Sequence, residues 1–158
     1  MRRVQVINPD SYLETETGRL WTPERDKAAW SRCFAALELA LATSLEPPPR
    51  VLIVCGLQGA GKSHWIESNA LDYAPCICFD AALPGAKHRR PIVELALQRN
   101  ADVLAIWIDT PLHIAKKRNA ERPEDKRVPD ESIESVASLF EPPELGEGFS
   151  SVIRIPGH

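Results

Sequence analysis

Runs of apolar residues alternate along this chain with stretches of helical patterning. Four of the runs are almost wholly apolar, which is typical of strands that are buried on both faces of a parallel sheet. They occupy residues 51–55, 76–79, 103–108 and 151–155. A shorter run, 4–7, ends at the turn-forming sequence Asn-Pro-Asp. It predicts a fifth strand followed by a loop.

Helical signals lie between these runs and are clearest after residue 21. Thr22 is a favoured N-cap and Pro23 suits the first helical position. Apolar residues then recur at helical spacing and predict a face that packs on the core. This face consists of Trp30, Cys33, Phe34, Leu37 and Leu41. Further helices are expected near 62–70, 88–99, 111–120 and 130–140.

The alternation of strand and helix predicts βαβ units and an α/β fold with a doubly wound parallel sheet. Three consecutive prolines at 47–49 cannot continue a helix, so they end the long helix and form a stiff connector. We expect a single domain over 1–158. It consists of a strand-helix segment over 1–46, a proline connector over 47–50 and a core over 51–158.

The sequence GLQGAGKS follows the apolar run 51–55 directly and matches the phosphate-binding P-loop pattern G-x-x-x-x-G-K-[ST]. Glycines at 56, 59 and 61 let the backbone turn its N–H groups inward around an anion, and the next helix directs its positive end there. Lys62 can reach the β and γ phosphates of a nucleoside triphosphate. Ser63 offers a hydroxyl ligand to Mg²⁺.

Asp80 ends a second buried strand, at the edge of the sheet where α/β folds bind their ligands. It is expected to hold Mg²⁺ together with Ser63; as an alternative, it is a turn-forming residue at a strand end. No Glu follows Asp80, so the water-polarising acid of motor ATPases is missing. The chain also lacks an NKxD segment that would read guanine, which argues against a GTPase switch.

Arginines follow the strand 103–108 at 118, 122 and 127. Arg118 and Arg122 share a helical face, and Arg127 lies in a polar segment beyond Pro123. Arginines in this position can close over a triphosphate and stabilise the γ-phosphoryl group during transfer. The full nucleotide-binding set that we expect is Gly56, Gly59, Ala60, Gly61, Lys62, Ser63, His64, Arg118 and Arg122.

Composition sets further limits on function. A formal net charge of −3 argues against a protein that coats nucleic acid with its whole surface. The four cysteines fall in apolar segments without zinc-site spacing and are expected to be reduced core thiols. No signal peptide, membrane-length apolar run or lipidation motif is present. We therefore expect a cytoplasmic protein with no membrane partner.

Three segments carry a resemblance to a known family: GLQGAGKSHW, WIDTPLHIAKKRNAERPEDKRVP and FEPPE. Together they resemble the polynucleotide 5'-hydroxyl kinase-like branch of the P-loop kinases, which includes the phage kinase domain and zeta-toxin-like ATP-binding proteins. In that family an Asp that accepts the proton of the acceptor hydroxyl follows the P-loop helix. Here only 71–75 separates that helix from the next strand, so the segment is absent from its usual place.

A similar segment stands at the front of the chain, where VINPDSYLETETGRLWTPERDKAAWSRCFAALELAL is similar to the family's strand, catalytic Asp, loop and long helix. The resemblance implies a circularly permuted chain with Asp10 as proton acceptor. It also implies a three-layer P-loop fold whose five parallel strands stand in the order 1-3-2-4-5, counted along the chain, with the P-loop strand central.

The implied activity is ATP- and Mg²⁺-dependent transfer of a phosphoryl group, with Asp10, Lys62 and Arg122 as catalytic residues. The acceptor is expected to be a single-stranded nucleic-acid 5'-hydroxyl end or a nucleotide-like molecule. Leu13 stands where the family often has an Arg for the acceptor phosphate; Arg19, Arg25, Arg89 and Arg90 are the candidate replacements. Two alternatives stay open: a sugar or nucleotide-sugar kinase, and a non-catalytic ATP-binding module. Trp21 is a candidate surface on which a base could stack.

Overall fold

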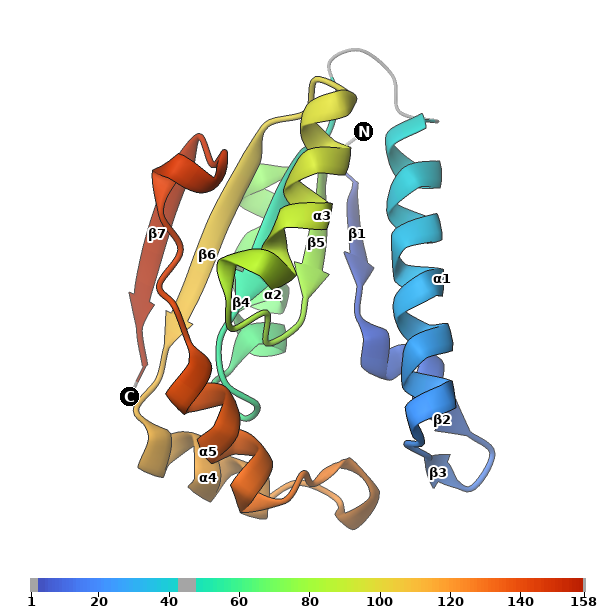
Figure 1. The fold of residues 1–158 in the computed structure, drawn as a ribbon, viewed down its shortest axis with the longest axis vertical. Coiled ribbons are helices and arrows are strands. Elements are labelled where there is room, and N and C mark those ends of the chain that lie inside the picture. The colour runs from blue at the N-terminus through green and yellow to red at the C-terminus, as the bar shows by residue number, and fades with distance from the viewer. Residues whose placement is uncertain (1–2, 43–47, 158) are drawn as a thin grey trace.

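A computed structural model describes residues 3–42 and 48–157. A central sheet is covered by helices on both faces (Figure 1). The strands are β1 (Val4–Ile7), β2 (Glu14–Thr15), β3 (Gly18–Arg19), β4 (Arg50–Cys55), β5 (Cys76–Asp80), β6 (Val103–Asp109) and β7 (Ser151–Pro156). The helices are α1 (Pro23–Ala42), α2 (Lys62–Asn69), α3 (Ala86–Gln98), α4 (Leu112–Ala120) and α5 (Asp130–Leu139). Short 3-10 turns are η1 (Pro9–Leu13), η2 (Ala70–Tyr73), η3 (Glu124–Lys126) and η4 (Leu145–Glu147).

The main sheet has five strands in the order β1-β5-β4-β6-β7, and all neighbouring pairs are parallel. This confirms the expected α/β fold class. The labels differ from the expected order because the hairpin β2–β3, which the sequence did not predict, takes two numbers. Counted without the hairpin, the five strands stand 1-3-2-4-5. The P-loop strand β4 lies in the middle, where Ile53 is in register with Phe79 on one side and Ala105 on the other.

Alternate residues of the central strands face two separate cores. On one face, Val51 and Ile53 of β4 pack with buried residues of α1 and α3, such as Leu37 and Ile92. On the other face, Leu52 and Val54 pack with buried residues of α2, α4 and α5. Both faces of β4 are therefore buried, which explains why its sequence shows no polar alternation.

The long helix α1 begins as its sequence predicts, because the Thr22 hydroxyl accepts a hydrogen bond from the Arg25 backbone N–H at 3.1 Å. Cys33, Leu37 and Leu41 are buried on the sheet. Trp30 stacks on Phe79 of β5 with ring centroids 5.9 Å apart. After the helix, Pro48 and Pro49 of the expected connector precede β4, and Pro47 lies outside the described residues.

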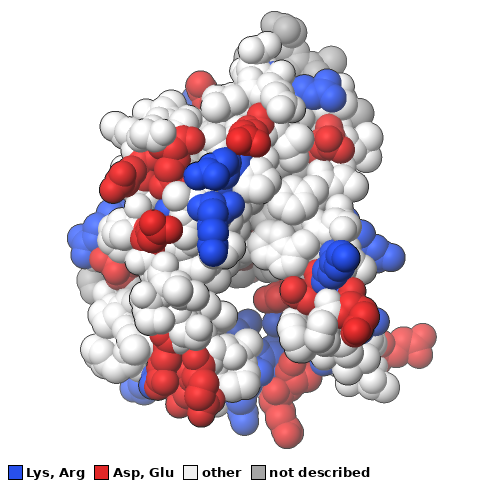
Figure 2. Space-filling model, in the orientation of Figure 1, with Lys and Arg blue, Asp and Glu red and all other residues white. Residues whose placement is uncertain are grey.

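The four cysteines are free and buried, as expected for core thiols. Within 3–42 and 48–157, no helix combines the length and apolar character needed to cross a membrane. Basic and acidic side chains are mixed over the face seen in Figure 2. This face therefore lacks the one-sign surface that a general nucleic-acid coat protein would need.

Leu37→Ala tests how α1 is attached to the sheet. Leu37 is fully buried, so the substitution should lower the free energy of unfolding by about 2–5 kcal/mol. Chemical denaturation measures this, with Leu39→Ala as the matched control because Leu39 of the same helix is 65% exposed. Equal losses in the two variants would contradict the packing described for α1.

Candidate nucleotide-binding site

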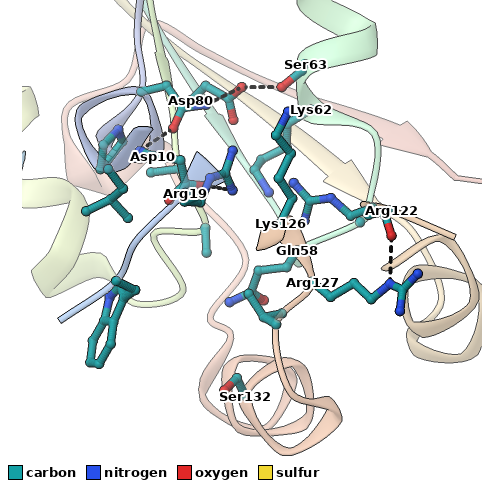
Figure 3. A pocket seen from close by; sticks show the side chains of 18 of the residues that line it. Asp10, Arg19, Gln58, Lys62, Ser63, Asp80, Arg122, Lys126, Arg127 and Ser132 are labelled. Carbon is teal, nitrogen blue, oxygen red and sulfur yellow. Dashed lines mark hydrogen bonds and ion pairs between the residues drawn. The ribbon is translucent and has the colours of Figure 1, made fainter. Parts of the chain in front are cut away.

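A cavity of about 780 Å³ opens at the carboxyl ends of β1, β4 and β5. Several separate segments line it: the residues after β1, the hairpin and the start of α1, the P-loop, the end of β5, and the segment from α4 to α5 (Figure 3). We call that last segment, residues 112–139, the lid. The lining residues are Asn8, Pro9, Asp10, Leu13, Arg19, Trp21, Asp26, Trp30, Gln58, Gly59, Gly61, Lys62, Ser63, His64, Asp80, Ala81, Ala82, Arg118, Arg122, Asp125, Lys126, Arg127, Val128, Pro129 and Ser132.

The P-loop connects β4 to α2, and its glycines at 56, 59 and 61 all have positive φ, as its sequence predicts. Gly59 shows why no larger residue fits: its φ is +82°, and an added Cβ would lie 2.5 Å from the Ala115 carbonyl oxygen of α4. The α2 helix begins at Lys62. The loop therefore presents backbone N–H groups and a helix N-terminus beside the cavity, which is the arrangement that binds phosphate.

Lys62 turns back onto its own loop. Its Nζ donates hydrogen bonds to the carbonyl oxygens of Gly56 at 3.1 Å and Leu57 at 2.9 Å. Burial lowers the pKa of Lys62, while the carboxylates of Asp80 and Asp10 oppose that shift. The loop thus holds a desolvated amine whose charged form an incoming phosphate would stabilise.

Ser63 and Asp80 come together, as expected from the sequence. The Ser63 hydroxyl donates to Asp80 Oδ2 at 2.7 Å, and Asn8 Nδ2 donates to the same oxygen at 3.4 Å. Asp80 is 4% exposed, and this burial raises its pKa, against the lowering effects of Lys62 and Ser63. A hydroxyl and a carboxylate beside a phosphate loop are the donors that Mg²⁺ uses in P-loop proteins, so the residues fit that ion.

Within the described residues, no group of three or more His, Cys, Asp or Glu side chains forms a metal cluster.

Asp10 lines the cavity from the 3-10 turn η1 that follows β1. The Asn8 side chain begins this turn by accepting the Asp10 backbone N–H at 2.9 Å. The Asp10 carboxylate is half-exposed, and its Oδ2 lies 3.4 Å from Arg19 Nη1. Arg19 also pairs with Glu14 at 3.3 Å. The parallel pairing of β1 with β5 brings the loop that carries Asp10 beside the end of β5.

The lid carries the expected arginines in different roles. Arg118 Nη1 donates to the Ala60 carbonyl oxygen at 2.9 Å, which ties α4 to the P-loop. Arg122 follows the end of α4, and its side chain extends toward Lys62 (Figure 3). Arg127 lines the cavity, but its Nε donates to the Arg122 carbonyl oxygen at 2.6 Å.

The buried side chain of Asn119 holds the lid segment in shape. Asn119 Nδ2 donates to the Val128 carbonyl oxygen at 2.7 Å, and Asn119 Oδ1 accepts the Val128 N–H at 3.0 Å. These two bonds join the end of α4 to the segment that precedes α5, so the polar residues between them form a closed loop.

Most of the expected site residues line one cavity: Asp10, Gly59, Gly61, Lys62, Ser63, His64, Asp80, Arg118 and Arg122. Gly56 and Ala60 do not line it. They act through their backbones, because their carbonyl oxygens accept from Lys62 and Arg118 respectively. Thr110 is a residue near the P-loop that the sequence did not predict. Its hydroxyl donates to the Ala60 carbonyl oxygen at 2.8 Å. This contact joins distant segments, so no local sequence pattern indicates it.

Four arginines are candidates to bind the acceptor phosphate in place of the Arg that is missing at position 13. Of these four, only Arg19 lines this cavity. Arg25 donates instead to the carbonyl oxygens of Leu20 and Leu13. Arg89 is fully buried and pairs with Glu147.

A family model described as an AAA domain matches residues 72–143. The match covers β5 through α5 and includes Asp80, Arg118 and Arg122, but it is less than half of the chain. No curated protein matches the chain significantly. The matched family is P-loop kinase-like, and with the parallel sheet and the loop after β4 it supports a P-loop nucleotide-binding fold.

Asp80→Asn should separate stability from ligand binding. Because burial raises the pKa of Asp80, its carboxylate opposes folding at pH 7. The free energy of unfolding of the ligand-free variant should therefore exceed that of the native chain at pH 7. The difference should shrink as the pH falls and Asp80 of the native chain takes up its proton. Binding of Mg²⁺-ATP should weaken in the same variant.

Denaturation at a series of pH values and calorimetric titration measure the two effects. Asp72→Asn is the matched control, because Asp72 is exposed and does not line the cavity. A variant that is less stable than the native chain at pH 7 would contradict the cost assigned to the Asp80 carboxylate.

Proposed function

We propose that this protein is an ATP- and Mg²⁺-dependent kinase that transfers the γ-phosphoryl group to a hydroxyl acceptor. The acceptor is a nucleic-acid 5'-hydroxyl end or a nucleotide-like molecule. One observation carries this proposal: a single cavity joins a phosphate-binding loop and lid arginines on one wall to a carboxylate, Asp10, on another. Phosphoryl transfer needs both, charge stabilisation at the donor and a group that takes the acceptor's proton.

The donor nucleotide would lie with its phosphates on the P-loop. The backbone N–H groups and Lys62 would bind the β and γ phosphates, and Arg122 would stabilise the transferring group. Ser63 and Asp80 would hold Mg²⁺, which neutralises phosphate charge when it is bound. Displacement of the Gly56 and Leu57 carbonyl oxygens by phosphate would free the Lys62 ammonium for this role.

The chemical step is a direct displacement at phosphorus. The Asp10 carboxylate accepts the proton of the acceptor hydroxyl, and the oxygen forms a bond to the γ phosphorus. The bond from that phosphorus to the β–γ bridging oxygen breaks, and ADP leaves with the electron pair. Arg19, which pairs with Asp10, orients the carboxylate toward the acceptor.

The wall around Asp10 suits a charged acceptor that carries a ring. Arg19 brings a cation into the cavity, and Trp21, two residues further on, is 60% exposed while lining the same cavity. The backbone is held on both sides of Trp21. Before it, the Leu20 N–H donates to the Leu13 carbonyl oxygen at 2.9 Å, and after it, Thr22 caps α1. An exposed indole on a backbone held in this way is a stacking surface for a nucleobase.

The proposed function includes a circular permutation relative to the polynucleotide 5'-hydroxyl kinase-like family. Its support is the position of the first segment: β1 occupies the sheet edge beside β5, and α1 covers the same face as α3. This segment thereby brings Asp10 to the cavity from the front of the chain instead of from between α2 and β5.

Transfer of labelled γ-phosphate from ATP tests the proposal directly. The native chain should label a 5'-hydroxyl oligonucleotide or a nucleoside in a panel that also contains sugars. Asp10→Asn should lower kcat by about 10²- to 10⁴-fold, because it removes the proton acceptor. It should leave ATP binding unchanged, and Asp72→Asn should leave both quantities unchanged.

The other outcomes separate the alternatives. Labelling of sugars alone would establish a small-molecule kinase. ATP binding without a labelled acceptor in any class would favour a non-catalytic ATP-binding module. Full activity of Asp10→Asn would remove Asp10 from the mechanism.

Trp21→Ala tests the acceptor class. Loss of base stacking costs about 1–3 kcal/mol, so KM for an acceptor with a base should rise roughly 5- to 150-fold. KM for ATP should not change, and Trp21→Phe should restore most of the affinity. An unchanged KM for oligonucleotide in Trp21→Ala would show that the exposed indole does not bind the acceptor.

A further inference from the structure

The small hairpin β2–β3 stands apart from the main sheet and carries Arg19 at its end. Each of its strands has two residues, and a two-stranded hairpin of this size has little stability of its own. Its position relative to the cavity must therefore depend on contacts with other segments.

One of these contacts comes from the lid, 106 positions along the chain. Asp125 Oδ2, on the turn η3, accepts the backbone N–H of Arg19 at 2.8 Å. The residue before Arg19 is Gly18, whose φ is +124°. A Cβ added to Gly18 would lie 3.0 Å from the same Asp125 oxygen. Because Gly18 has no side chain, the Asp125 carboxylate can lie close to the hairpin backbone. There it accepts the Arg19 N–H.

The two segments joined by this contact carry different parts of the proposed site. The Arg19 guanidinium pairs with Asp10 on the acceptor side. The η3 turn lies between Arg122 and Arg127 on the donor side and is part of the loop that Asn119 closes. The bond from Asp125 therefore runs from the lid to the residue that orients the proposed proton acceptor.

We propose that Asp125 is a positioning residue: it fixes the hairpin against the lid and so holds the Arg19 guanidinium on Asp10. This inference rests on the proposed kinase function for its effect on catalysis, but the contact itself can be tested without any acceptor. The Arg19 N–H bond lowers the pKa of Asp125, which agrees with an ionised carboxylate at this contact at neutral pH.

The first experiment needs only the protein. Asp125→Ala removes the acceptor of the Arg19 N–H, so amide hydrogen exchange across 14–20 should become faster by about ten-fold or more. Asp125→Asn keeps an oxygen at the same place and should restore most of the protection. Glu124→Ala is the matched control, since Glu124 is an exposed acid on the same turn that does not line the cavity. Unchanged exchange across 14–20 in Asp125→Ala would overturn the proposal.

The second experiment measures catalysis with the acceptor found for the native chain. Asp125→Ala should lower kcat by about 10- to 100-fold, because misplacement of a reacting group by 1 Å can cost about 10²-fold. KM for ATP should stay unchanged, because the P-loop contacts are intact, and Asp125→Asn should recover most of kcat. A loss confined to KM for ATP, or no rescue by Asp125→Asn, would reject the positioning role.

The two experiments separate this inference from the proposed function. Absence of transfer by the native chain would reject the kinase activity, while faster exchange in Asp125→Ala would still establish the contact between hairpin and lid. Transfer by the native chain with full kcat in Asp125→Ala would reject the positioning role alone.

Discussion

The site depends on the cost of burying charge at the end of the central strand. Asp80 is buried and Lys62 is partly buried at the carboxyl edge of the sheet. Desolvation lowers the pKa of Lys62 and raises the pKa of Asp80, so it favours the neutral form of both. Two backbone carbonyl oxygens and the Ser63 hydroxyl compensate part of this cost. Phosphate and Mg²⁺ would compensate the rest, so the ligand-free site is prepared for an anion and a cation together.

Strand order determines what else reaches this site. In a parallel sheet the carboxyl ends of all strands lie at one edge, and the loops that follow them meet there. Because β1 is placed beside β5, Asn8 can donate to Asp80, and Asp10 follows two residues later. Residues 8–10 thereby contribute to a cavity whose main phosphate loop begins 46 residues after Asp10.

The lid and the hairpin enclose the other side of the cavity without extending the main sheet. Asn119 shapes the lid through two hydrogen bonds to Val128, and Arg118 ties α4 to the P-loop. The hairpin is held by its Arg19–Glu14 ion pair, by the pair of Arg19 with Asp10 and by Asp125. Each contact is weak by itself, but together they determine where the cations of the cavity lie.

The sequence by itself determined the strands, the helices and the phosphate loop, because these follow from local periodicity and from the backbone freedom of three glycines. It also brought Asp10, Ser63, Asp80 and Arg122 together as candidates, through a resemblance and through the rule that strand ends meet. It missed the hairpin, since two-residue strands carry no periodic signal. It could not choose among four arginines, and only the tertiary structure placed Arg19 in the cavity and Arg89 in a buried ion pair. The contact of Asp125 with Arg19 was equally hidden, because it depends on how two distant loops meet in space.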